Sequence, residues 1–182
     1  MRQTLKLHPA CRCEAVKSIE ADAERPEPGR LLFRFRVTGR IADVRWPPPV
    51  PAARIDALWQ HTCFEAFLSA PPDKGYLEFN FAPSTEWAAY SFDAYREGMR
   101  IPGGFEAPAI ATRRGESEFE LEAALDWDGL PDGAIWRLGL SAVVEETNGR
   151  RSYWALAHAG ARPDFHHADA FALELPLLRQ QS

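Results

Sequence analysis

Hydrophobic and polar residues alternate with a period of two along most of this chain. The clearest region is 58–98, where three alternating segments, 62–70, 76–82 and 87–93, are separated by turn-rich loops. Such alternation is typical of β-strands that bury one face and expose the other. The pattern therefore predicts three consecutive strands with one apolar face and one face rich in carboxylates, an amide and aromatic rings.

The same alternation and turn signals recur through the rest of the sequence. The Asn148-Gly149 pair predicts a hairpin, and the proline run at 46–51 cannot donate sheet hydrogen bonds, so it is expected to be a loop. Short helical turns are expected within 51–59 and at 126–130. Further strands are predicted at 4–8, 13–21, 31–37, 110–114, 118–125, 136–144, 151–157 and 171–177. These features predict an all-β fold: one domain over 1–182, an antiparallel two-sheet β-sandwich, immunoglobulin-like or jelly-roll-like.

Composition narrows the classes of function. The 182 residues are 46% hydrophobic and carry a net charge of -5, so the chain lacks the basic stripe that nucleic-acid binding requires. No apolar run has the length of a signal peptide or a membrane span, and the three cysteines (Cys11, Cys13, Cys63) are odd in number. A cytoplasmic protein with free thiols and no membrane or nucleic-acid partner is expected, and its oligomeric state stays open.

The alternation also predicts which side chains share the polar face. With Phe64 and Phe79 in the core, Glu65, Glu78 and Asn80 face away from it. For the third strand we expect Ala88, Tyr90 and Phe92 to face the core, which leaves Trp87 beside the carboxylates. Arg137, Ser141 and Glu145 are expected on the same side from a later strand.

Such a face is suited to a sugar. An aromatic ring stacks on the apolar face of a pyranose, and carboxylates, amides and arginines bind its hydroxyl groups. The alternative is an ordinary solvated sheet face whose charges serve solubility.

Four segments together resemble a known family: LWQHTCFEAFL, YLEFNFAPS, FELEAALDWDGLP and RLGLSAVVEETNGRRSYWALAH. They are similar to the family 9 carbohydrate-binding modules and the wider DOMON-like superfamily, including bacterial DOMON-like proteins. The resemblance implies an immunoglobulin-like sandwich that holds a sugar or a haem. In family 9 modules two tryptophans sandwich a sugar end while a glutamate binds hydroxyls, which implies such roles for Trp59, Trp154 and Glu65. The segment 158–167 departs from the family pattern.

Haem is the alternative ligand that the resemblance implies. DOMON cytochromes bind iron through a methionine and a histidine, so Met99 would pair with His158 or His166. The histidines also belong to a loop, 162–169, that concentrates imidazole and carboxylate groups. We expect local hydrogen bonds to hold this loop, rather than a metal ion.

Two further classes remain open. Glu65 and Glu78 on adjacent strands resemble the carboxylate pair of a glycoside hydrolase, although the sequence lacks a nucleophile elbow or a phosphate loop. The segment around Trp46 could dock on a partner protein or cover a sheet edge.

The sequence thus predicts a non-catalytic module that binds a small polar ligand, a carbohydrate, with no metal and no cofactor unless haem. The predicted ligand-binding residues are Trp59, Glu65, Glu78, Asn80, Trp87, Arg96, Trp154, His158, Asp164 and His166.

Overall fold

Eleven β-strands make up the part of the chain that the computed structural model describes, namely residues 2–70, 75–104, 106–127 and 135–175. All pairings between these strands are antiparallel. The strands are β1 (Gln3–Leu7), β2 (Val16–Glu27), β3 (Arg30–Gly39), β4 (Cys63–Ser69), β5 (Tyr76–Phe81), β6 (Trp87–Phe92), β7 (Ala109–Arg114), β8 (Glu118–Asp126), β9 (Trp136–Glu145), β10 (Arg151–Ala155) and β11 (Leu173–Leu175).

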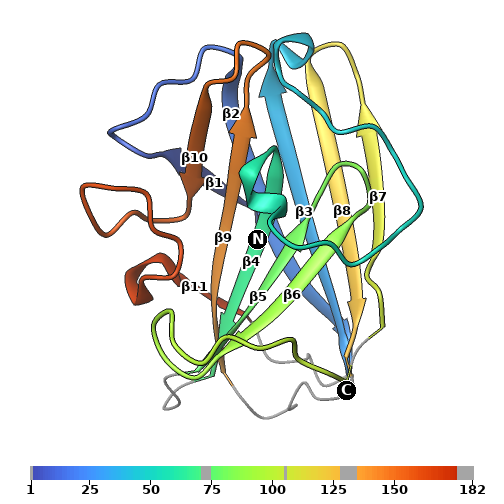
Figure 1. Ribbon diagram of the computed structural model, residues 1–182, viewed down its shortest axis with the longest axis vertical. Helices are drawn as coiled ribbons and strands as arrows, with labels where there is room; N and C mark the ends of the chain where they lie inside the picture. The colour runs from blue at the N-terminus through green and yellow to red at the C-terminus, as the bar shows by residue number, and fades with distance from the viewer. Residues whose placement is uncertain (1, 71–74, 105, 128–134, 176–182) are drawn as a thin grey trace.

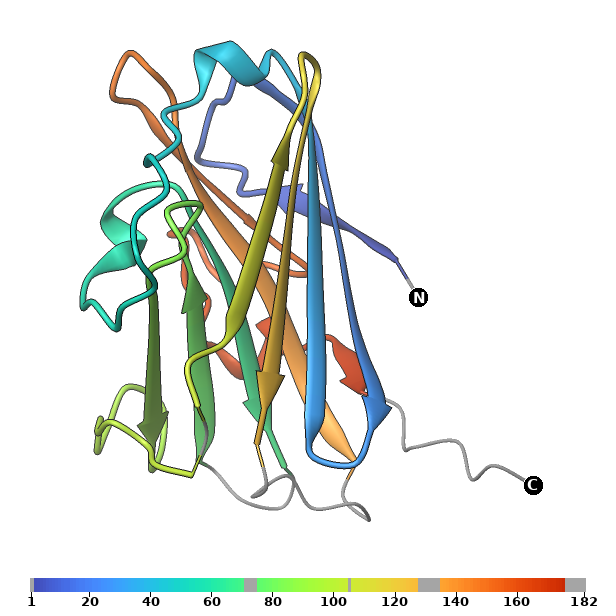
Figure 2. The same ribbon diagram turned by 90° about the vertical axis from the view of Figure 1, so that its right-hand side faces the viewer.

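The strands form two layers that face each other (Figures 1 and 2). One layer has the order β2-β3-β8-β7, and the other has the order β6-β5-β4-β9-β10, with β11 beside β9. Strand β1 joins the layers, because its first half pairs with β2 and its last residues pair with β10. The fold is the predicted all-β antiparallel sandwich.

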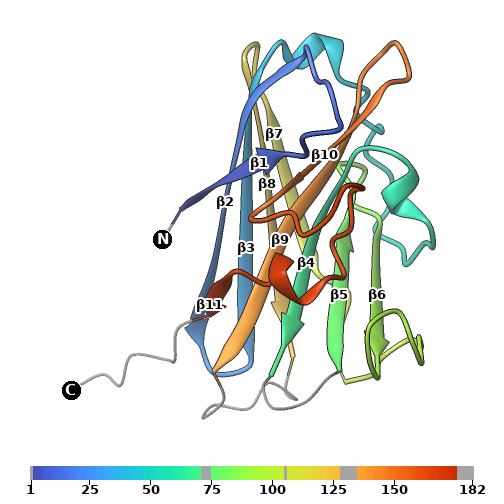
Figure 3. The ribbon, with the colours of Figure 1, turned by 90° about the vertical axis from the view of Figure 1, so that its left-hand side faces the viewer.

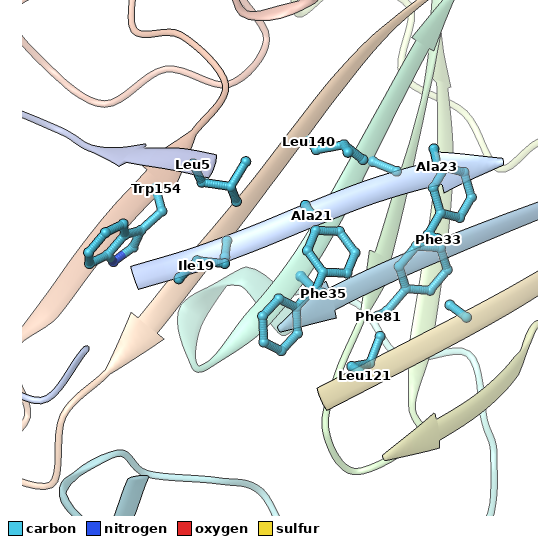
Figure 4. Packing of buried hydrophobic residues seen from close by; sticks show 14 of the residues in the cluster. Leu5, Ile19, Ala21, Ala23, Phe33, Phe35, Phe81, Leu121, Leu140 and Trp154 are labelled. Atoms are coloured by element: carbon cyan, nitrogen blue, oxygen red, sulfur yellow. The ribbon is translucent and has the colours of Figure 1, made fainter. Parts of the chain in front are cut away.

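The main core lies between the layers and follows the predicted alternation. Phe33 and Phe35 of β3 are buried and contact Phe81 and Phe64 of the opposite layer, at centroid distances of 5.6 and 5.0 Å. Figure 4 shows side chains from β1, β2 and β3 packed into this space. The alternating strands fold this way because each must bury its apolar face against the other sheet.

The outer face of the β2-β3-β8-β7 layer is the solvated surface that alternation leads one to expect. Ion pairs run across its strands, for example Arg34 to Glu122 at 2.9 Å and Arg36 to Glu118. A shallow groove of about 230 Å³ between these charges is lined by arginines and carboxylates that pair with one another. Exposed pairs of this kind add little stability and mainly keep the face soluble.

The outer face of the other layer is different, since most of it is covered. Figure 3 shows the segment that follows β10 crossing in front of β9 and β4. Phe165 and Phe171 of this segment join side chains of the strands in a second hydrophobic cluster on this face. Its other members are Phe67, Tyr76, Ala88, Tyr90, Phe92, Val143 and Ala155. Strands β4 and β9 are therefore buried on both faces.

The predicted strands agree with the structure to within a few residues, apart from β2, which extends to Glu27. Of the range 51–59, where a short helical turn is expected, only Leu58 and Trp59 are helical, as part of the 3₁₀ turn η2 (Leu58–Gln60). Two further 3₁₀ turns occur at η1 (Ile41–Asp43) and η3 (Ala168–Ala170). The turn expected at 126–130 and the end of the strand expected at 171–177 extend beyond the described residues. Within the described ranges, no helix has the length and apolarity needed to span a membrane.

Candidate functional site

Strand register places the predicted polar residues of β4, β5 and β9 on one face. Glu65 lies opposite Asn80 on β5 and opposite Ser141 on β9, while Glu78 lies opposite Tyr90 on β6. Directly opposed residues of antiparallel strands point to the same side of the sheet. The predicted phase of β4 and β5 is therefore confirmed.

The predicted phase of β6 is wrong. Trp87 lies opposite Phe81 and packs against the main core, whereas Ala88, Tyr90 and Phe92 lie on the outer face. The cause is register, because Phe81 faces the core and its directly opposed partner must do the same. Tyr90 thus takes the position beside Glu78 that we expected for Trp87.

A pocket of about 740 Å³ opens on this outer face. Its size is in the usual range for small-molecule sites. Five of the predicted residues, Trp59, Glu65, Glu78, Arg96 and His166, line it. The other lining residues are Arg54, Asp56, Ala57, Tyr90, Met99, Arg100, Ile101, Val143, Tyr153, Pro163 and Phe165.

Trp59 stands at the rim of this pocket on the 3₁₀ turn η2 and keeps 48% of its surface exposed. The turn follows Ala57, whose φ of 63° lies in the left-handed region, and Arg96 on the neighbouring loop has a φ of 56°. A non-glycine residue in this conformation costs about 1 kcal/mol or more and is often found at binding sites. Two of the strained residues in the described chain thus line the same pocket.

Asp164 connects, through hydrogen bonds, two loops that line one side of the pocket. Its Oδ1 accepts hydrogen bonds from Arg96 Nη2 at 2.9 Å and from the His166 backbone N–H at 3.1 Å, while its Oδ2 accepts one from the Tyr95 hydroxyl at 2.6 Å. These bonds to an ionised group join the β6–β7 loop to the loop after β10. Asp164 therefore positions Arg96 and His166, and it is not itself part of the lining.

His166 is neutral at neutral pH. Burial and the positive charge of Arg96 lower its pKa to about 4, although Asp164 acts in the opposite direction. The Tyr76 hydroxyl accepts the Arg96 backbone N–H at 3.2 Å and lies 2.8 Å from His166 Nδ1. This pattern favours the tautomer that accepts at Nδ1 and carries its proton on Nε2, which lies 3.8 Å from Glu78 Oε2.

Two nearly buried carboxylates form the floor of the pocket. Glu65 and Glu78 are 3% and 5% exposed. Burial raises the pKa of Glu65 well above its usual range, and the charge of Glu78 raises it further. Burial also raises the pKa of Glu78, although Asn80 and Arg96 favour its ionised form.

Asn80 supports this floor from beneath, since it is 0% exposed. Its Nδ2 donates to Glu78 Oε1 at 2.7 Å, and its Oδ1 lies 3.6 Å from Cys63 Sγ. We predicted Asn80 as a ligand contact, but the structure buries it below the lining. Burial and the neighbouring carboxylates raise the pKa of Cys63 well above its usual value, which disfavours the reactive thiolate form.

On β6, beside Glu78, a second set of contacts fixes Tyr90. Its hydroxyl donates to Asp56 Oδ1 at 2.7 Å, the same oxygen that accepts Arg54 Nη2 at 2.8 Å. The Arg54 guanidinium also lies over the Tyr90 ring, 5.3 Å from its centroid. The aromatic ring is thereby held rigidly beside the carboxylates.

Trp154 and His158 lie away from the pocket. Trp154 is 5% exposed in the main core, near Leu5 and Ile19 in Figure 4, and its Nε1 donates to Ser152 Oγ at 3.0 Å. His158 Nε2 bonds to the Lys6 carbonyl at 2.7 Å and its ring contacts His8. The residue that lines the pocket from β10 is Tyr153, one position away, because successive strand residues point to opposite faces.

Trp46 packs against the protein's own residues and is not a free ring that projects toward a partner protein. Its ring stacks on Phe119 at a centroid distance of 3.9 Å, and its Nε1 donates to the Ile41 carbonyl at 2.8 Å. The proline-rich segment after it therefore starts from a fixed, partly buried ring.

Sequence reasoning missed the residues that loops bring to the pocket, such as Arg54, Asp56, Ile101 and Phe165. A signal for a covered face was present, because Phe67 and Val143 interrupt the polar side of their strands with large apolar residues. Strands buried on both faces have such near-continuous apolar runs. The described ranges contain no group of three or more His, Cys, Asp or Glu side chains arranged to hold a metal ion.

The fold is shared with sugar-binding proteins of known structure. No protein-family model and no curated protein matches the sequence. A candidate carbohydrate-binding protein from Bacteroides uniformis is similar with a TM-score of 0.69 and 14% identity, over 93% of this chain and 83% of the other.

A family 9 carbohydrate-binding module from Caldicellulosiruptor kristjanssonii, solved with glucose, is similar with a TM-score of 0.57 and 12% identity, over 97% of this chain and 85% of the other. The same module with cellotriose gives a TM-score of 0.57 and 12% identity, over 97% and 83%. At such identities the likeness shows a common fold of the carbohydrate-binding-module type. Membership of the DOMON-like superfamily stays a prediction.

Proposed function

We propose that this protein binds a carbohydrate, without chemical change, in the pocket on the outer face of β4, β5, β6, β9 and β10. The observation that carries the proposal is the combination, in one pocket of about 740 Å³, of the exposed Trp59 ring with the buried carboxylates of Glu65 and Glu78. The shared fold with a glucose complex supports it.

The lining offers both kinds of contact that a sugar ring needs. Trp59, Tyr90 and Tyr153 present ring surface on which the C–H face of a pyranose can stack. Glu65 and Glu78 can accept hydrogen bonds from hydroxyl groups, and His166 Nε2–H can donate one.

The site is organised before a ligand arrives. Asp164 fixes Arg96 and His166, Asn80 fixes Glu78, and Asp56 fixes Tyr90. Groups held in place lose little conformational entropy on binding, and this improves the affinity for a ligand of matching shape.

Binding without chemistry is favoured over glycoside hydrolysis. A hydrolase needs one carboxyl group that stays protonated and one that stays ionised, so the two environments must move the pKa values apart. Burial raises the pKa of both Glu65 and Glu78, and that of Glu65 more strongly, so the preference for binding rests on the fold shared with carbohydrate-binding modules.

Haem is less suited to this pocket than a sugar. Met99 and His166 both line it, but Nδ1 of His166 is bonded to the Tyr76 hydroxyl and its Nε2 faces Glu78. Two buried carboxylates on the floor would face the apolar macrocycle, which is unfavourable because haem pockets need apolar walls.

Isothermal titration calorimetry with glucose, galactose, mannose and their β-linked disaccharides tests the proposal. We expect at least one sugar to bind with a Kd in the millimolar range or lower, and Glu65→Ala to abolish the heat signal while the variant stays folded. Silence across the whole panel would refute sugar binding. Turnover of a chromogenic glycoside would instead establish a hydrolase, and a Soret band in the purified protein would establish a haem protein.

A further inference from the structure

Among the charged side chains that line the pocket, the arginines are paired with carboxylates, but two carboxylates have no cationic partner among the described residues. Each arginine of the lining has its own carboxylate partner: Arg54 with Asp56 at 2.8 Å, Arg96 with Asp164 at 2.9 Å and Arg100 with Asp93 at 2.7 Å. His166 carries no charge at neutral pH, since its pKa is about 4. Glu65 and Glu78 are left over, because no described arginine or lysine lies within 4.0 Å of either carboxylate.

The two unpaired carboxylates lie at the bottom of the pocket and not on its rim. Glu65 and Glu78 both line the pocket and are 3% and 5% exposed. The Ser141 hydroxyl, directly opposite Glu65, is also buried, and its interaction with Glu65 favours the ionised form of that carboxyl group. Buried carboxylates without a cationic partner are costly, so an arrangement of this kind indicates a ligand group that supplies the positive charge.

The carboxylates of Glu65 and Glu78 determine which chemical group of a ligand would bind them best. Two carboxylates on one floor repel each other, and the charge of Glu78 opposes ionisation of Glu65. A neutral hydroxyl donates a single hydrogen bond and leaves the repulsion in place. A protonated amine donates three hydrogen bonds and brings a positive charge into direct contact with both carboxylates, whose ionised forms Arg96, itself paired with Asp164, favours only from beyond 4.0 Å.

We propose that the ligand of this pocket carries a protonated primary amine, as an amino sugar does, and that Glu65 and Glu78 bind this amine. The proposal deepens the sugar-binding function above and rests on it. Trp59 and Tyr90 would then contact the ring, while the paired arginines keep the rest of the lining neutral.

Calorimetry at neutral pH tests the proposal with matched ligands: glucose, galactose and mannose, their 2-amino derivatives, and the N-acetylated forms of these derivatives. We expect at least one amino sugar to bind roughly tenfold or more tightly than its parent hexose, as charge-assisted hydrogen bonds allow. N-acetylation removes the charge and should abolish this preference.

Substitutions that remove single charges test which carboxylates bind the amine. Glu65→Gln keeps the size of the side chain and removes its charge, so it should bring the amino sugar and its parent hexose to similar affinity. Glu116→Gln, on the exposed β7–β8 turn of the other layer, is the matched control and should leave the preference unchanged. Glu78→Gln provides a second variant if Glu65→Gln fails to fold, as circular dichroism would reveal.

The outcomes separate the two proposals. If the hexoses bind as tightly as their amino derivatives, the amine proposal is refuted and sugar binding stands. If ethanolamine binds as tightly as the best amino sugar, the amine is recognised but the sugar ring is not. If none of these ligands binds, both proposals fail.

Discussion

Asn80 Nδ2 donates a 2.7 Å hydrogen bond to Glu78 Oε1, so a fully buried amide sets the position of a carboxylate that faces the pocket. The two residues are two positions apart on β5 and therefore lie on the same face of the sheet. Asn80 thus fixes Glu78 from outside the pocket lining.

The Asn80–Glu78 bond gives the first prediction. Asn80→Ala removes the donor that favours the ionised form of Glu78, so the pKa of Glu78 should rise further. The lost bond should also lower the free energy of unfolding by about 1–3 kcal/mol. Chemical denaturation measures the stability, and the pH dependence of ligand affinity reports the pKa. An unchanged pH profile would contradict the positioning role.

Trp59 and Trp154 should respond oppositely to substitution. Trp154 is buried in the main core, so Trp154→Ala should destabilise the fold by about 3–5 kcal/mol. Trp59 is 48% exposed at the pocket rim, so Trp59→Ala should change stability by less than about 0.5 kcal/mol. It should nevertheless weaken sugar affinity roughly tenfold. Thermal unfolding and calorimetry on both variants check this, and unchanged affinity in Trp59→Ala would exclude stacking on this ring.

The raised pKa of Glu65 predicts how its substitution depends on pH. A carboxyl group whose pKa is higher in the folded chain stabilises the fold below its unfolded pKa, near 4.5, and this contribution is lost as the pH rises through the folded pKa. Glutamine stays uncharged throughout. Glu65→Gln should therefore be about as stable as the unsubstituted protein near about pH 4 and more stable, by about 1 kcal/mol or more, near about pH 8. Denaturation curves at the two pH values measure this, and a difference independent of pH would argue against it.

His166 should titrate far below an ordinary histidine. Burial and the charge of Arg96 lower its pKa from the usual 6.5 to about 4, so the folded protein takes up this proton at a lower pH than the unfolded chain does. Its neutral form therefore stabilises the fold above about pH 6.5, and this contribution is lost as the pH falls toward about 4. NMR titration of the His166 ring protons measures the pKa directly.

The same titration in Arg96→Asn tests the cause of the shift. Asparagine tolerates the left-handed backbone at this position, and it removes the positive charge near the ring. The pKa of His166 should then move upward. A pKa near 6.5 in the unsubstituted protein would show that the ring is not buried as described.

The sequence predicted the sandwich and, on β4 and β5, the two carboxylates of the pocket, because both depend on local alternation. Phe64, Phe79 and Phe81 determine the inward faces of β4 and β5, and this places Glu65 and Glu78 together on the outer face. The same reasoning failed for β6, where either phase buries aromatic rings. Only the pairing of Phe81 with Trp87 selects one of them.

The sequence by itself determined the period-two faces, the turns and the polar floor, since these follow from the order of neighbouring residues. The tertiary structure alone decided that Trp154 belongs to the core and Tyr153 to the pocket. It also decided that distant loops bring Arg54, Phe165 and Ile101 to the carboxylates. These features depend on contacts between segments far apart in the chain, and local periodicity carries no information about which loops cover which face.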